Sequence, residues 1–158
     1  IHKMESLYLR IAERLREIVP ELEHIDEDTG QLYPVQYDDR YAYPILFPCC
    51  LIDASTTDYK VEKYPDMQRG TVTVTIKVAF QCDEDSHYSS IENNNTFEQM
   101  RHRLAINKKV VCALHGYCFG DDVSAMQRTQ ARAYPLAGRV KVYESTFNVN
   151  ITEELFLE

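Results

Sequence analysis

The sequence predicts an α+β fold, in which a mainly antiparallel sheet of four to five strands carries two helices packed on one face. Residues 5–19 and 96–118 repeat apolar side chains at helical spacing, whereas residues 71–80 alternate apolar and polar side chains with the period of a strand. Further strand-like segments follow one another between and after the helices, an order that favours antiparallel pairing. The 158 residues contain no linker long enough to divide them, so we expect one domain over residues 1–158.

The first helix is predicted over residues 5–19. Leu7, Ile11 and Leu15 fall on one face at helical spacing, and charged residues cover the opposite face. Pro20 then blocks continuation, because it has no backbone N–H and its ring clashes with the preceding turn.

The segment after this helix contains turn residues, tyrosines and one apolar run. Asp26 to Gly30 is a turn cluster, so residues 24–33 predict a hairpin or a strand edge. Ile45 to Ile52 is almost wholly apolar and predicts a short buried strand. Residues 53–69 are mostly polar and predict a loop or a hairpin.

Residues 71–80 give the strongest strand pattern in the chain. Polar or small residues alternate there with large apolar residues, and the segment is rich in β-branched side chains, which predicts a long strand with one buried face. The side chains expected on that face are Val72, Val74, Ile76, Val78 and Phe80. The polar residues 82–95 predict a loop.

A second helix is predicted to begin at Thr96, which forms a capping-box pattern with Gln99. Asn107 is expected to split this helix into two pieces, and Gly116 and Gly120 to mark its end. Its apolar stripe is expected to comprise Phe97, Met100, Leu104, Val111, Leu114 and Cys118.

Two strands are predicted in the last part of the chain. Ala125 to Arg132 is a candidate edge strand, and Val140 to Ile151 reads as a long strand. The apolar residues of the long strand change phase along its length, so we expect a bulge near Tyr143.

Charge and composition limit the classes of function. The chain holds 17 basic and 25 acidic residues, a net charge of −8, which argues against wrapping nucleic acid or lying on an anionic membrane. No apolar run approaches the roughly 20 residues of a membrane span. The five cysteines are odd in number, so we expect free thiols in a reducing cytosol. We expect Met4 to lie near the natural start, and residues 1–3 to be a tag remnant or disordered.

Two short patterns resemble metal sites and have simpler explanations. Asp26, Asp28 and Gly30 suggest a calcium loop, but the glycine and the twelfth-position ligand are misplaced, so we expect an Asp-rich turn. Cys112-x-x-His115-x-x-Cys118 could offer zinc ligands, but a closed site needs a fourth. We expect the two cysteines to pack in the core, and we expect no metal and no cofactor.

The sequence offers one candidate enzyme site. Asp53, Asp58 and Lys60 loosely resemble the carboxylates and lysine of a metal-dependent nuclease, in which the carboxylates would hold Mg²⁺. Their spacing is short and the acidic chain offers little to bind a DNA backbone, so a polar loop is the favoured interpretation. No nucleophile elbow, phosphate-binding glycine loop or dinucleotide fingerprint is present. We therefore predict no catalytic residues and no enzyme activity.

Tyrosines suggest an adhesive surface instead. The chain has 11 tyrosines and no tryptophan, and four of the tyrosines fall within residues 33–43. Tyrosine is enriched in protein interfaces, although these rings could equally cover a sheet edge. Charges are segregated too: acidic residues concentrate in 83–85 and 121–122, and basic residues in 101–109 and 128–141. Opposed patches of this kind can set the register between subunits.

Several segments, taken in order, resemble the tail terminator and tail completion proteins of long-tailed bacteriophages and prophages. The resemblance covers most of residues 5–152. It rests on the segments Leu7-Tyr8-Leu9-Arg10-Ile11-Ala12-Glu13-Arg14-Leu15, Ile25-Asp26-Glu27-Asp28-Thr29-Gly30-Gln31-Leu32, Phe47-Pro48-Cys49-Cys50-Leu51-Ile52, the strand at 71–80, Val111-Cys112-Ala113-Leu114-His115-Gly116-Tyr117, Arg128-Thr129 and Val142-Tyr143-Glu144-Ser145-Thr146-Phe147.

The resemblance implies a ring, commonly of six copies, that caps the tail tube, stops its growth and joins it to the head. Its partners would be other copies of itself, the tail tube and head-completion proteins. DNA would slide through without specific binding, past an acidic lumen. The subunit would occur in the bacterial cytoplasm during assembly and then in the virion tail, without contacting a membrane.

Candidates for the ring interface are the Tyr33–Tyr43 segment and the loops at 53–69 and 82–95, on exposure and composition alone. The tyrosines involved are Tyr33, Tyr37, Tyr41, Tyr43, Tyr59 and Tyr64. Three other functions stay open: a head–tail connector or neck subunit, a metal-dependent nuclease using Asp53, Asp58 and Lys60, and a small ligand-binding domain.

Overall fold

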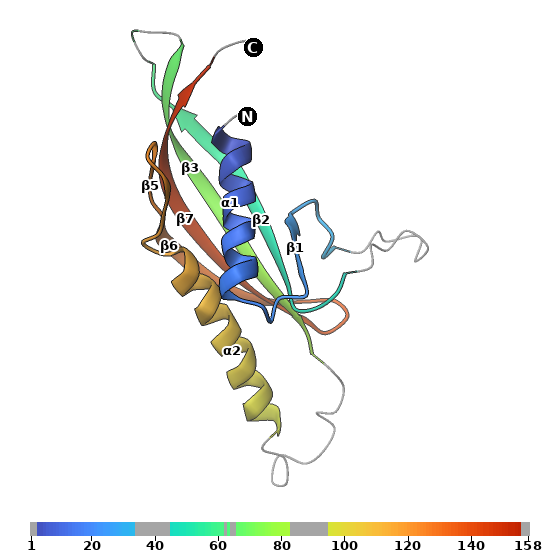
Figure 1. Cartoon of the computed structure of the whole chain (residues 1–158). Helices are drawn as coiled ribbons and strands as arrows, with labels where there is room; N and C mark the ends of the chain where they lie inside the picture. Colours follow the sequence, from blue (N-terminus) through green and yellow to red (C-terminus); the bar gives the residue numbers. More distant parts are fainter. Residues whose placement is uncertain (1–2, 34–44, 62, 64–65, 83–94, 156–158) are drawn as a thin grey trace.

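The computed structural model describes residues 3–33, 45–61, 63, 66–82 and 95–155 (Figure 1). Two helices lie on one face of a curled, mostly antiparallel seven-stranded sheet with the order β1-β2-β3-β7-β5-β4, and β6 also pairs with β7. The elements are α1 (Lys3–Ile18), β1 (His24–Glu27), β2 (Cys49–Tyr59), β3 (Met67–Gln81), α2 (Asn95–Leu114), β4 (Cys118–Gly120), β5 (Val123–Ala125), β6 (Gln127–Leu136) and β7 (Val140–Glu154).

The α+β class and the placement of both helices on one face are confirmed, but the predicted number of strands was too low. The additional strands are β4 and β5, which have three residues each, whereas the four-residue β1 is the strand edge predicted within residues 24–33. Strands of this length are too short to show a two-residue period. β1 runs parallel to β2, so the sheet is mixed. No helix among the described residues is both long and apolar enough to cross a membrane.

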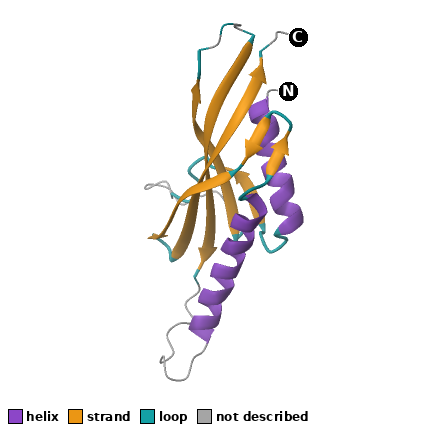
Figure 2. Cartoon of the chain, turned by 90° about the vertical axis from the view of Figure 1, so that its left-hand side faces the viewer, coloured by secondary structure: helices purple, strands orange, loops and turns teal. Residues whose placement is uncertain are grey.

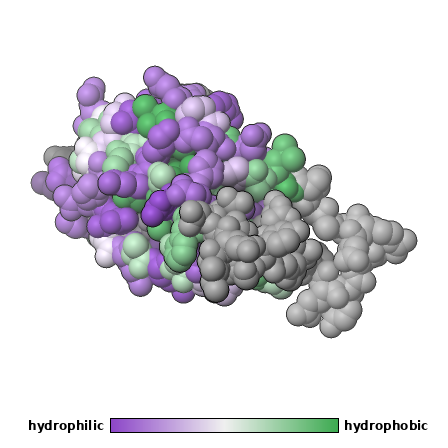
Figure 3. Space-filling view, turned by 90° about the horizontal axis from the view of Figure 1, so that it is seen from below, coloured by the Kyte–Doolittle hydropathy of each residue, from purple (hydrophilic) through white to green (hydrophobic). Residues whose placement is uncertain are grey.

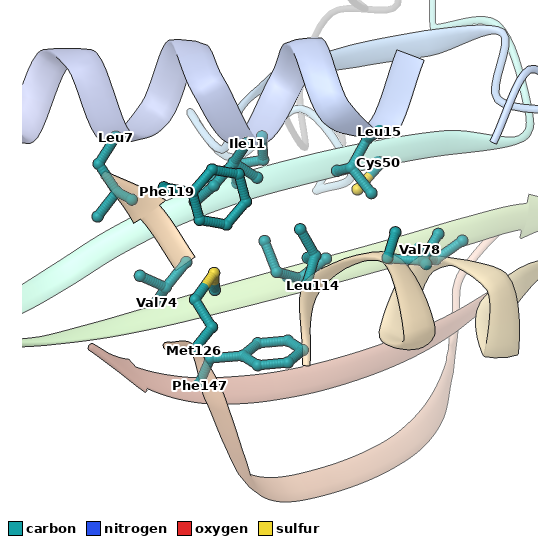
Figure 4. Packing of buried hydrophobic residues seen from close by; sticks show 14 of the residues in the cluster. Leu7, Ile11, Leu15, Cys50, Val74, Val78, Leu114, Phe119, Met126 and Phe147 are labelled. Carbon is teal, nitrogen blue, oxygen red and sulfur yellow. The ribbon is translucent and has the colours of Figure 1, made fainter. Parts of the chain in front are cut away.

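The core under the helices is built from the predicted faces of α1 and β3. Leu7, Ile11 and Leu15 are almost fully buried against the alternate residues of β3 from Val72 to Phe80 (Figure 4). The N–H of Val19 still donates to the carbonyl of Leu15 before Pro20 ends the helix. A polar contact ties α1 to the sheet edge as well, because the Tyr8 hydroxyl accepts the N–H of Ala54 at the β2 bulge.

A second, smaller core lies on the opposite face of the sheet and explains two sequence patterns. Cys49 and Cys50 are adjacent and both fully buried, because Cys49 faces the second core and Cys50 the first. In β7, Val142 belongs to the second core and Phe147 to the first. The bulge predicted near Tyr143 is therefore wrong: β7 pairs with β3 in unbroken register, and the apolar phase changes because the buried face changes.

Residues 53–69 were predicted as a loop or a hairpin, and the hairpin is confirmed. β2 begins at Cys49 and continues to Tyr59, and β3 begins at Met67, so residues 53–59 and 67–69 form the far ends of a β2–β3 hairpin. The polar side chains of this stretch are tolerated because one face of the sheet there is not covered by a helix (Figure 1). The predicted loop at 82–95 falls almost entirely outside the described residues.

α2 is one continuous helix, so the predicted split at Asn107 is wrong. The helix ends as expected: Gly116 follows with a positive φ of 79°, the left-handed conformation that glycine adopts without steric cost. Gly120, in contrast, lies in β4. Only the C-terminal half of α2 packs on the sheet, while its N-terminal half extends beyond it (Figures 1 and 2).

Candidate assembly surfaces

The nuclease candidates are not brought together. Asp53 and Asp58 both lie on β2, opposite Thr75 and Thr71 of β3, and Lys60 follows the strand. At about 3.3 Å per residue, the two aspartates are roughly 15 Å apart along the strand, too far to share one metal ion. Burial raises the pKa of Asp53, and nearby Asp28 adds to this effect. The geometry therefore gives no support to a two-carboxylate Mg²⁺ site.

The calcium-like pattern forms a turn, as expected. The N–H of Gly30 donates to Asp28 Oδ1 at 3.0 Å, and the N–H of Glu27 donates to Asp26 Oδ1 at 2.8 Å. Asp28 also forms a 2.8 Å ion pair with Lys77. These carboxylates serve the turn and the sheet, and the described part of the chain contains no group of three His, Cys, Asp or Glu residues placed to hold a metal.

The zinc-like pattern is dispersed as well. His115 Nδ1 accepts the N–H of Arg128 at 3.0 Å, and the Cys118 thiol contacts the Val123 carbonyl. Cys112 and Cys118 are both exposed, so the expectation that they pack in the core is wrong. All five cysteines are free thiols, as predicted from their odd number.

A charged network lies on the face of the sheet that the helices leave open. Arg132 Nε donates to Glu144 Oε2 at 2.5 Å, and the Tyr134 hydroxyl donates to the other carboxylate oxygen at 3.1 Å. Burial opposes ionisation of Glu144, but these hydrogen bonds outweigh it and lower the pKa of Glu144. Burial and the neighbouring carboxylate raise the pKa of Tyr134. The network joins β3, β6 and β7, because Lys77 lies directly opposite Glu144.

The exposed N-terminal half of α2 carries an apolar face that sequence reasoning placed in the core. Phe97, Met100 and Leu104 are 58%, 41% and 46% exposed. The residues that α2 does bury are Ile106, Val110, Ala113 and Leu114. At 100° per residue the mean directions of these two sets lie about 130° apart around the helix. Seen from the end at which α2 projects, the coloured surface is mostly hydrophilic, with hydrophobic residues at several places (Figure 3).

The β2–β3 hairpin exposes a second apolar group. Val61 is fully exposed, and Tyr59 and Met67 are about 40% exposed. The ring of Tyr59 covers Gly70, where an added Cβ would lie 2.9 Å from it, and its hydroxyl donates to Glu153 Oε2. Of the other tyrosine candidates, Tyr33 is exposed after β1. Tyr37, Tyr41, Tyr43 and Tyr64 lie outside the described residues.

β6 is the long edge strand that the sequence predicted. It begins at Gln127, two residues later than expected, and continues to Leu136. Its first seven residues are all exposed, and the described strands pair with it on one side alone, through β7. Pro135 lies within it, which fits an edge strand because proline lacks the N–H that a second neighbour would need.

A hollow of about 540 Å³ lies between α2 and the end of β3. Its lining includes Phe47, Phe80, Glu98, His102 and Arg103, a mixture of aromatic and charged side chains. This is where the small-ligand alternative would be tested.

Comparison with known proteins gives a likeness of fold. No protein family and no curated protein matches the sequence. Among the solved structures, a chain of the virion of a native gene transfer agent particle aligns with a TM-score of 0.56. The alignment covers 92% of this chain and 94% of that chain, at 10% sequence identity. The two chains therefore share a fold along nearly their whole lengths.

Proposed function

We propose that this chain is a structural subunit of a phage-like particle, and that it acts as a tail terminator, forming a ring that caps the tail tube and joins it to the head. The observation that carries the proposal is the likeness to a virion chain over 92% of this chain and 94% of the other.

The surface supports an assembling subunit. A helix that buries one apolar face and exposes another on its projecting half is costly in water unless a partner covers it. Phe97, Met100 and Leu104 form that face, and Tyr59 and Val61 form a second group on the projecting hairpin. Two separate contact regions on one small domain suit a subunit that touches both its own copies and other tail or head proteins.

The charge suits a conduit for DNA. The chain has a net charge of −8, so a ring of several copies would carry a large negative charge. Such a ring repels the phosphate backbone and lets it slide without being held. The proposed site of action is the bacterial cytoplasm during assembly and afterwards the tail of the particle.

The test is deletion of this reading frame from the element that encodes the particle, followed by electron microscopy. A tail terminator predicts tail tubes of uncontrolled length that are not joined to heads, with recovery when the wild-type chain is supplied. Tubes of normal length that fail to join heads would assign the chain to the neck instead. Normal, infective particles would refute the proposal, and Mg²⁺-dependent DNA cleavage lost in Asp58→Ala would favour the nuclease.

A further inference from the structure

The edge strands β1 and β6 lie on opposite sides of the sheet and share the same cross-strand rows. The register can be followed across five strands: Asp26 lies beside Leu51, Leu51 opposite Lys77, Lys77 opposite Glu144, and Glu144 opposite Arg132. The next row runs in the same way from Ile25 of β1 to Ala133 of β6. Among the described strands, β1 and β6 each pair on one side only. The short edge strand β1 and the exposed edge strand β6 therefore lie at matching positions on the two sides of the sheet.

The backbone groups at both edges point outward at matching positions. Next to β1, the N–H of Asp28 donates to the carbonyl of Ile52. The backbone N–H and C=O of Asp26 therefore point towards β2, and those of Ile25 and Glu27 point outward. In β6, Pro135 requires an outward-facing nitrogen, so Ala133, two residues earlier in unbroken register, also faces outward. Ile25 and Ala133 thus lie in the same cross-strand row, at the two edges of the sheet, and their backbone N–H and C=O groups point away from the neighbouring strand.

Strand direction favours pairing between these edges. β2 is parallel to β1, and the ladder β2-β3-β7-β6 alternates direction at each step, so β6 runs opposite to β1. A neighbouring copy in the same orientation would present β1 antiparallel to β6. This contact joins two different surfaces, as a closed ring requires.

Charge makes the pairing selective. The exposed side chains of the β6 edge include Arg128 and Arg132, and β1 carries Asp26 and Glu27. Two β6 edges would bring arginines together and two β1 edges would bring carboxylates together, which is unfavourable, whereas β6 against β1 pairs opposite charges. At the matching level, Asp26 of one copy would lie beside Arg132 of the next.

We infer that copies of this chain associate head to tail, with β6 of one copy pairing antiparallel to β1 of the next, Ile25 opposite Ala133 and Asp26 beside Arg132. This rests on the proposed ring and names its subunit interface. The strand contact is short: Ile25 offers both its backbone groups, while the N–H of Glu27 is bonded to Asp26 and its carbonyl to Gln31. Side-chain charge and the number of identical contacts in a closed ring add to it.

The charge test uses two variants, Asp26→Arg and Arg132→Glu, examined separately and as a mixture by light scattering. Each variant alone places like charges at every contact and is expected to stay monomeric. In a mixture, alternating copies pair Arg132 with Asp26 at one contact and the two substituted residues at the next, so rings with an even number of copies are expected to return. Thermal unfolding of each variant checks that it remains folded, and Arg132→Gln shows the effect of losing the Glu144 ion pair without reversing the charge.

A cross-linking test detects the same contact when it is weak. Glu27→Cys combined with Ala131→Cys, in a chain whose Cys82, Cys112 and Cys118 are serines, is expected to give a ladder of disulfide-linked copies. Directly opposite residues on antiparallel strands have Cα atoms about 4.5–5.5 Å apart, within the range of a disulfide. Glu27→Cys with Lys108→Cys, which lies away from the edge, should give no ladder.

The outcomes separate this inference from the ring itself. If the wild type and both charge-reversal variants all form rings, and the double-cysteine variant gives no disulfide ladder, the β6–β1 contact is refuted and the ring still stands. A wild-type chain that stays monomeric while the cysteine pair gives no ladder would refute both. Recovery of rings in the mixture alone, together with the ladder, is the result that the inference predicts.

Discussion

Two phenylalanine-to-alanine substitutions test whether the N-terminal half of α2 lies outside the core. Phe147 is fully buried in β7, at the centre of the cluster beneath the helices, whereas Phe97 is 58% exposed on the projecting half of α2. Replacing each with alanine removes the same atoms from two different environments. The expected losses of stability therefore differ mainly because of burial.

The magnitudes follow from that difference. Phe147→Ala opens a cavity in a close-packed core and is expected to cost about 3–5 kcal/mol in the free energy of unfolding. Phe97→Ala removes a side chain that already contacts water over most of its surface. The small loss of burial, about 1 kcal/mol, is offset by the better helix propensity of alanine, about 0.5 kcal/mol. For a chain of this size, the midpoint of thermal unfolding should fall by about 10 °C for Phe147→Ala and by less than about 2 °C for Phe97→Ala.

Urea unfolding followed by circular dichroism measures the free energy of unfolding of the wild type and of each variant. It should be done at a concentration at which light scattering shows monomers, so that loss of assembly does not add to the loss of stability. Equal losses for the two variants would mean that the N-terminal half of α2 is packed in the free subunit, contrary to the exposure of Phe97.

Three further predictions follow from local features. Gly116→Ala places a side chain at a φ of 79° and should cost about 1 kcal/mol, whereas Gly116→Asn should cost less; equal losses in urea unfolding would contradict the left-handed cap. Because the pKa of Glu144 is lowered in the folded chain, its contribution to stability is present above the unfolded-state pKa of about 4.3 and is lost as pH falls below it. Glu144→Gln should therefore flatten the decline in the free energy of unfolding between about pH 5 and pH 3, and an unchanged decline would contradict the network. A thiol reagent at pH 8 should modify Cys82, Cys112 and Cys118 rapidly but Cys49 and Cys50 only after unfolding, because burial raises the pKa of both buried thiols, that of Cys49 to about 11; rapid reaction of all five would contradict their burial.

The sequence predicted the elements whose pattern has a single cause. α1 and β3 each bury one face, so their periods of 3.6 and two residues mark their cores directly. Where both faces are buried, the pattern changes its meaning. Cys49 and Cys50 read as one apolar run, and the shift of phase in β7 suggested a bulge, because a sequence does not say that a second core lies behind the sheet.

α2 failed for a related reason. Of the stripe predicted from the sequence, Phe97, Met100 and Leu104 are exposed, whereas Leu114 is buried as expected. A signal for the buried face was present, because Ile106, Val110 and Ala113 repeat at helical spacing on another side of the helix. Spacing alone does not say which face meets the sheet and which is left for a partner. The aspartates at 53 and 58 misled in the same way, since closeness in sequence becomes separation along an extended strand.

Light scattering on a size-exclusion column shows whether the chain assembles into a closed ring. Over a range of protein and salt concentrations, we expect a discrete species of fixed mass; six copies of the 18.4 kDa chain give about 110 kDa. A mass of one chain at every concentration, or a mass that grows without limit, would contradict it.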